Sequence, residues 1–129
     1  MIDNYLTIDS FEKCIKKAIN NIKIGNLNEA IEYIHEAMLQ DDSSPKPHNL
    51  LGIIYEIRGE LDLARKHYRA SYSLDPTFKA SSINLERISS FSYKFNIENI
   101  KYGYESLIPE KYYYEIVYDE KNIGRLKRL

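Results

Sequence analysis

A repeat of 34 residues is the feature that most constrains how this sequence can fold. When residues 11–44 are shifted onto residues 45–78, Gly25 falls on Gly59 and Ala30 falls on Ala64. The other identities are Ile19 with Ile53, Leu27 with Leu61, and Asp41 with Asp75. A fixed period of this length is typical of a chain that stacks equivalent units of secondary structure.

The second copy has the pattern of two amphipathic helices joined by a tight turn. Gly59 suits the left-handed position that ends a helix, and Pro76 ends the second helix because proline cannot continue it. Small residues occur where the helices must approach closely, and large residues fill the spaces between them. The small ones are Gly52, Ala64 and Ser71, and the large ones are Leu51, Tyr55 and Tyr68.

This set of residues, from His48 to Pro76, resembles one tetratricopeptide repeat, a helix–turn–helix unit with the same period. The chain as a whole is similar to a small bacterial-type protein of that family. Its first copy departs from the pattern at Lys17, Asn21 and Asp42, and terminal repeats are often atypical because one flank faces water. The resemblance implies an all-α fold, a right-handed superhelix of two helical hairpins over residues 11–44 and 45–78.

The hydrophobic spacing predicts where the individual helices begin and end. After a lead-in over residues 1–6, the first helix runs to about Ile24, and the second begins at Asn26 or Asn28. Helices three and four are expected at about 45–58 and 61–74. A fifth helix begins near Thr77 and forms a partial third repeat over residues 79–95.

The repeat pattern stops after the fifth helix, which leaves an apolar face for another segment to cover. Seven of the twelve tyrosines lie from Tyr93 onward, so we expect residues 96–129 to pack as a tyrosine-rich cap on a repeat domain of residues 1–95. Within this extension we predict a short helix ended by Pro109. A short hairpin is a further expectation, with a strand over residues 111–118, a turn over residues 119–122 and a return over residues 123–129.

Composition excludes several classes of protein. A net charge of −1 gives no electrostatic reason to expect nucleic acid as the main partner. The apolar runs are too short for a membrane span, and the first residues lack the basic region of a secretory signal. Cys14 has no second cysteine to pair with, which is typical of a reducing compartment. We therefore expect a cytoplasmic protein.

The sequence offers no set of catalytic or metal-binding residues. Its three histidines, His35, His48 and His67, and its one thiol, Cys14, show no spacing typical of a metal site. No glycine-rich loop suited to phosphate is present. We interpret His48 and Cys14 as packing residues, and we expect no enzyme activity, no metal and no cofactor.

In the family that the chain resembles, the first helices of successive repeats line a concave groove that binds peptides. The resemblance implies that a partner-binding groove here consists of Ile15, Ile19, Ile22, Asn49, Ile53, Ile83, Asn84 and Arg87. Members that bind chaperones grip a terminal carboxylate with Lys, Asn and Arg side chains. The corresponding places here hold Ile15, Ile19, Ala80 and Asn84, so that ligand is not expected.

The resulting hypothesis is a non-catalytic protein–protein interaction module. A peptide or partner helix would bury its apolar side chains on the isoleucines, while Asn49, Asn84 and Arg87 fix its register. An equal alternative for the isoleucines is that the start or the end of the chain covers them. A second hypothesis is a homodimer formed through the fifth helix and the tail. A third, nucleic-acid binding through the basic residues Lys121, Arg125, Lys127 and Arg128, is the weakest.

Overall fold

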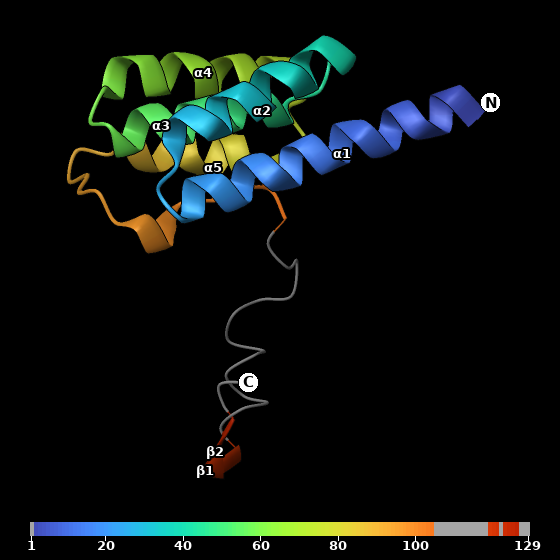
Figure 1. The fold of residues 1–129 in the computed structure, drawn as a ribbon. Coiled ribbons are helices and arrows are strands. Elements are labelled where there is room, and N and C mark those ends of the chain that lie inside the picture. Colours follow the sequence, from blue (N-terminus) through green and yellow to red (C-terminus); the bar gives the residue numbers. More distant parts are fainter. Residues whose placement is uncertain (1, 105–118, 122, 127–129) are drawn as a thin grey trace.

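In a computed structural model, the structure describes residues 2–104, 119–121 and 123–126 (Figure 1). Five α-helices follow one another: α1 (Ile2–Lys23), α2 (Leu27–Gln40), α3 (Lys46–Ile57), α4 (Leu61–Leu74) and α5 (Lys79–Ile88). A single 3₁₀ turn, η1, covers Ile97–Asn99, and two short strands follow, β1 (Asp119–Lys121) and β2 (Ile123–Leu126). Each helix packs against the next one along the chain. The expected all-α fold of stacked helical hairpins is confirmed.

The two inter-helix turns have the same geometry in both repeats. Gly25 and Gly59 both have a left-handed backbone, with φ values of +89° and +83°. The N–H of Gly25 donates to the carbonyl of Ile22 at 3.1 Å, and the N–H of Gly59 donates to the carbonyl of Glu56 at 3.0 Å. These partners are again 34 residues apart. Left-handed glycine is the common way to end a helix, because no Cβ opposes that conformation.

The ends of α2 and α4 repeat one another as well. Asp41 and Asp75 cap these helices with nearly identical extended backbones. The Asp41 side chain accepts a hydrogen bond from the N–H of Ser43 at 3.0 Å, and Asp75 accepts one from the N–H of Thr77 at 3.0 Å. Such local bonds favour a turn over a longer helix. The period seen in the sequence is therefore a period in local structure.

The core lies between the helices and depends on close approach of α3 to α4. The Tyr68 ring is fully buried against Gly52, where an added Cβ would come within 2.5 Å of the ring. Helix α1 has the small residue Ala18 at the place that Gly52 has in α3, and it too is fully buried. Small residues at these positions let the aromatic and aliphatic side chains fill the space between the helices.

Three predicted boundaries are wrong. Helix α1 begins at Ile2, so residues 2–6 are helical and not a lead-in. Helix α5 ends at Ile88, because the Ser90 hydroxyl accepts a hydrogen bond from the N–H of Ser92 and favours a local turn, which leaves Phe91 fully exposed. In place of the short helix expected before Pro109, the described part has only η1, started by a bond from the N–H of Glu98 to Asn96.

The strands near the end of the chain form an antiparallel pair, with Asp119 opposite Arg125 and Glu120 opposite Gly124. The expected turn over residues 119–122 is misplaced, because residues 119–121 are themselves a strand. The strand expected over residues 111–118 lies outside the described residues, as does Pro109.

Candidate partner-binding face

One face of the helical stack is formed by α1, α3 and α5, and residues 100–104 of the same chain lie across it (Figure 1). We call it the α1/α3/α5 face. On α3, residues Lys46, Asn49, Ile53 and Glu56 recur at helical spacing, so the helix presents them on one side. The contacts of these residues with the covering segment define the candidate site.

Asn84 on α5 binds the main chain of Lys101. Its amide nitrogen donates to the Lys101 carbonyl at 2.8 Å, and its amide oxygen accepts from the Lys101 N–H at 2.9 Å. Asn49 on α3 donates a second hydrogen bond to the same carbonyl at 3.0 Å. Because all three hydrogen bonds are to backbone atoms, the pair recognises main chain and not a particular side chain. We call Asn49 and Asn84 the main-chain clamp.

Both donors and the acceptor oxygen of the Asn84 side-chain amide are hydrogen-bonded. Besides Lys101, Asn84 donates to the Asn49 amide oxygen at 2.9 Å and accepts from Arg87 at 2.9 Å. Both asparagines are fully buried. A buried amide with both donors and its acceptor in use has only one favourable orientation. Arg87 therefore fixes which way the Asn84 amide points.

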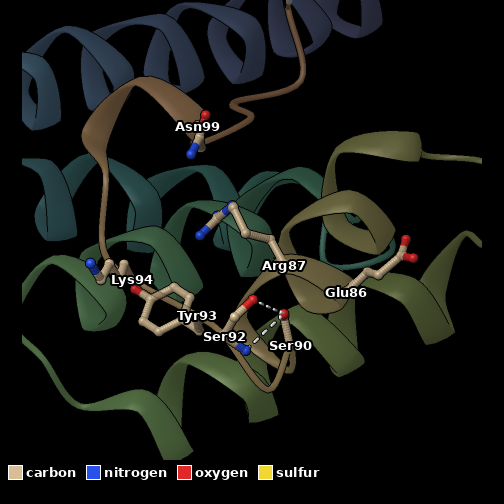
Figure 2. A pocket seen from close by; sticks show the side chains of 7 residues that line it. All are labelled: Glu86, Arg87, Ser90, Ser92, Tyr93, Lys94 and Asn99. Carbon is tan, nitrogen blue, oxygen red and sulfur yellow. Dashed lines mark hydrogen bonds between the residues drawn. The ribbon is translucent and has the colours of Figure 1, made fainter.

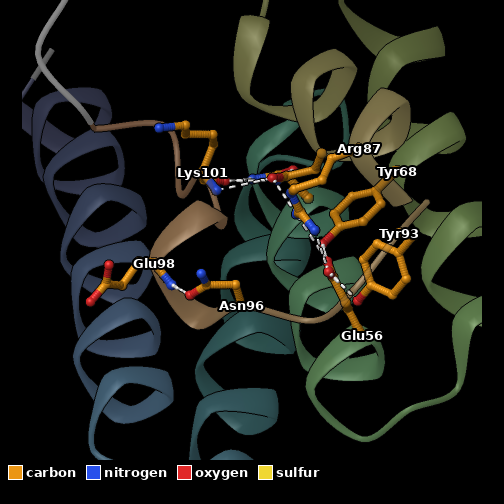
Figure 3. A network of polar contacts seen from close by, with 9 residues as sticks. Glu56, Tyr68, Arg87, Tyr93, Asn96, Glu98 and Lys101 are labelled. Atoms are coloured by element: carbon orange, nitrogen blue, oxygen red, sulfur yellow. Dashed lines mark hydrogen bonds and ion pairs between the residues drawn. The ribbon is translucent and has the colours of Figure 1, made fainter. Parts of the chain in front are cut away.

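Arg87 is itself held by Glu56, an acid on α3 that is only 2% exposed. The guanidinium contacts both carboxylate oxygens, one of them at 3.1 Å. The hydroxyls of Tyr68 and Tyr93 donate to the same carboxylate at 2.7 and 2.8 Å (Figure 3). This fork-to-fork pairing is the strongest geometry available to a buried ion pair. The network therefore runs from Tyr68 through Glu56 and Arg87 to the clamp.

The buried carboxylate changes the chemistry of its tyrosine partners. Burial and the nearby Glu56 carboxylate raise the pKa of the Tyr68 hydroxyl far above its ordinary value. The same two causes raise the pKa of Tyr93 to about 12. Both hydroxyls therefore keep their protons at neutral pH and act as donors to Glu56.

The covering segment also contacts α1 and the start of α3. The Tyr104 hydroxyl donates to Glu12, which forms an ion pair with Lys46 at 3.2 Å. The Lys46 ammonium lies 4.9 Å from the centre of the Tyr104 ring, and the Lys23 ammonium lies 5.1 Å from that of Tyr102. Both distances are suited to cation–π contact. The two tyrosines therefore have specific partners on α1 and α3.

Two further residues fix the path of this segment. Ile100 is 4% exposed and belongs to the same buried hydrophobic cluster as the isoleucines of α1. Gly103 has a left-handed backbone, and a Cβ there would come within 2.6 Å of the Phe78 ring. The chain can thus approach the start of α5 closely only with glycine at this position.

The structure places the predicted groove residues in three settings. Asn49, Asn84 and Arg87 come together in the network described above. Ile83 lies apart from it and is 42% exposed. The other four are buried in the hydrophobic core: Ile15, Ile19, Ile22 and Ile53.

Sequence reasoning gave Glu56 no role, and it predicted a cap over residues 96–129 without the contacts that residues 100–104 make. Glu56 is the one acid of α3, and an acid that is buried needs a partner. Nothing local could have found Ile100 or Lys101, because their partners lie on distant helices. Tyr93 was counted among the tyrosines of the expected cap, with no partner assigned to it.

A surface cavity of about 480 Å³ adjoins the network (Figure 2). Its lining consists of Glu86, Arg87, Ser90, Ser92, Tyr93, Lys94 and Asn99. The Nε atom of Arg87 is buried and has no hydrogen-bond partner among the described residues. Arg87 therefore belongs both to the wall of this cavity and to the network behind the clamp.

The residues first considered for chemistry have packing contacts. His48 and His67 are stacked, with their Nδ1 atoms 3.1 Å apart, and Tyr55 stacks on His67. Cys14 is buried, which raises the pKa of its thiol. Within the part of the chain that the structure describes, no cluster of His, Cys, Asp and Glu could hold a metal ion. None of the described helices combines the length and the apolar character needed to cross a membrane.

Comparison with known proteins agrees with this geometry. The family model of the tetratricopeptide repeat matches residues 45–78, which are α3, α4 and the loop that follows them. No curated protein and no solved structure matches the chain. Tetratricopeptide repeats are in general protein–protein interaction modules. The chain thus contains a tetratricopeptide repeat over residues 45–78, and α1 and α2 form a structural copy of that repeat beside it.

Proposed function

We propose that this chain is a non-catalytic interaction module that binds an extended protein segment on its α1/α3/α5 face. The observation that carries the proposal is the main-chain clamp, in which Asn49 and Asn84 hold the backbone of Lys101. Two amides that bind the backbone N–H and C=O of one residue suit any main chain, while the surrounding side chains select among sequences. The described residues offer no arrangement suited to catalysis that competes with this proposal.

The proposal divides the chain into two functional parts. Residues 1–95 are the repeat domain that provides the face, and residues 96–129 are an extension that caps it. The predicted groove residues Ile15, Ile19, Ile22 and Ile53 supply the apolar floor, with Ile83 at its edge. The free, buried Cys14 is consistent with a reducing compartment, so we place the protein in the cytoplasm.

Affinity capture from the native host tests this proposal. The full-length chain is compared with Asn84→Ala on the face and with Lys66→Ala, which changes an exposed residue of α4. We expect at least one protein to be retained by the unaltered chain and by Lys66→Ala, and to be lost with Asn84→Ala. Equal capture by all three chains would mean that partners bind elsewhere. Circular dichroism confirms that each variant is folded.

A second candidate function is self-association, which the exposed apolar residues of this region favour. Ile83 on α5 and Phe91, Phe95 and Ile97 beyond it are all exposed. An exposed apolar set of this kind commonly marks an interface. Sedimentation over a concentration series distinguishes the two functions. A dimer that Phe91→Ser abolishes would support self-association, and a monomer at all concentrations would exclude it.

A further inference from the structure

The segment over residues 100–104 is bound as a separate ligand would be bound. Residues 94–99 before it are all exposed, so the chain that leads to it makes little use of the core. Ile100 is buried, Lys101 bonds to α3 and α5, and Tyr104 bonds to Glu12 on α1. A short anchored stretch at the end of an exposed connection belongs to the part of a protein that opens most easily.

Recognition of this segment follows a simple pattern. The position of Ile100 requires a buried aliphatic side chain. At Lys101 only the main chain is held, and Figure 3 shows its side chain pointing away from the network. The rings of Tyr102 and Tyr104 each lie beside a lysine, and the Tyr104 hydroxyl reaches Glu12.

We propose that residues 100–104 are an internal ligand of the α1/α3/α5 face, and that a partner protein displaces them with a segment of the same pattern. That segment has a branched aliphatic residue, then any residue, then an aromatic residue, a glycine and a second aromatic residue. This inference rests on the proposed function and names the class of partner. The occupied face is closed until such a segment competes for it.

A second copy of the chain is not the expected occupant. It offers the same residues 100–104 without a tether, whereas the tethered segment has an effective concentration on the order of millimolar. At ordinary protein concentrations the tethered segment therefore occupies the face in preference to a second chain. A displacing segment must bind more tightly than Ile-Lys-Tyr-Gly-Tyr, or must belong to a partner held by further contacts.

Fluorescence anisotropy with a labelled peptide of residues 97–104 tests the inference on full-length chains. The variant Ile100→Asp removes the buried anchor of the internal segment and leaves the face unaltered. The matched control, Ile97→Asp, places the same charge on an exposed residue three positions earlier. Relieved of the tethered competitor, Ile100→Asp should bind the peptide roughly tenfold or more tighter than the unaltered chain and Ile97→Asp.

Variants of the peptide test how it is recognised. Replacing Lys101 by Ala in the peptide should leave affinity unchanged. Methylating the backbone nitrogen of Lys101 in the peptide removes the donor to Asn84 and should weaken binding roughly tenfold. If Ile100→Asp does not fold, Gly103→Ala serves as the second opening variant, because its Cβ would meet the Phe78 ring.

Three results would overturn the inference. These are equal peptide affinity in the unaltered and opened chains, unchanged affinity after methylation, or an opened chain that dimerises more tightly than it binds the peptide. If the peptide does not bind the opened chain while captured partners still depend on Asn84, the proposed function stands and only this inference is wrong. If capture does not depend on Asn84 and the peptide also does not bind, the proposed function and this inference are both wrong.

Discussion

Glu56 on α3 and Arg87 on α5 form a two-point ion pair whose carboxylate is fully buried. The pair joins the matched repeat to the helix that follows it, and through Asn84 it determines how the clamp is oriented. A buried pair of this kind is a weak source of net stability, but breaking it leaves one uncompensated charge in the core. Its position suggests that the pair orients the face as well as joining the helices.

Removing Glu56 should destabilise the fold strongly. We expect Glu56→Ala to lower the free energy of unfolding by about 3 to 5 kcal/mol, because Arg87 then stays buried without its counter-ion. Urea denaturation measures the change. The control is Asp62→Ala, which breaks the exposed pair with Arg65 and should have little effect. Similar losses in the two variants would show that the Glu56 pair is screened by water.

Equivalent substitutions in the two turns should have equal effects. Gly25→Ala and Gly59→Ala each place a side chain on a left-handed backbone, which costs about 1 to 2 kcal/mol. Neither added Cβ meets a neighbouring atom, so the effect is purely conformational. Asparagine at either place should be tolerated better than alanine. An effect at one turn and none at the other would mean that the two hairpins are not equivalent in solution.

The sequence was sufficient to predict the repeats because their determinants are local. A left-handed glycine ends a helix wherever it occurs, and an aspartate that caps its own turn acts within two residues. The spacing of Gly25 and Gly59 therefore predicted both turns. The same holds for α4, whose bounds were correct to the residue.

A cap over residues 96–129 was expected, but its contacts and the end of α5 could not be predicted in this way. Lys101 bonds to Asn49 on α3 and to Asn84 on α5, and Ile100 joins the core cluster. Both depend on tertiary packing that no local sequence pattern predicts. Helix α5 was expected to continue because Phe91 and Phe95 fit its spacing, but a serine turn ended it first. Of the predicted site residues, the polar ones were brought together, while Ile83 was left at the edge.

Stability should fall below neutral pH because of the histidine pair. Burial lowers the pKa of His48 and His67 from the ordinary value of 6.5, and for His67 the neighbouring His48 adds to the effect. The unfolded chain therefore binds more protons, so stability is full above pH 6.5 and decreases as the pH falls toward the lowered values. The melting temperature measured across this range should fall less steeply in His67→Gln.

His35→Gln is the matched control for that experiment, because His35 is exposed on α2. The His35→Gln variant should show the same dependence of melting temperature on pH as the unaltered chain. If His67→Gln and His35→Gln give the same dependence on pH, the close approach of the two Nδ1 atoms has no energetic consequence.

The most direct test of the occupied face is hydrogen exchange at one backbone amide. In the full-length chain the N–H of Lys101 donates to Asn84. NMR-detected exchange should be slowed about tenfold or more relative to an unstructured peptide, and Asn84→Ala should abolish the protection. The amide of the exposed Lys94 provides the internal reference. A Lys101 amide that exchanges at the unstructured rate in the unaltered chain would contradict the account.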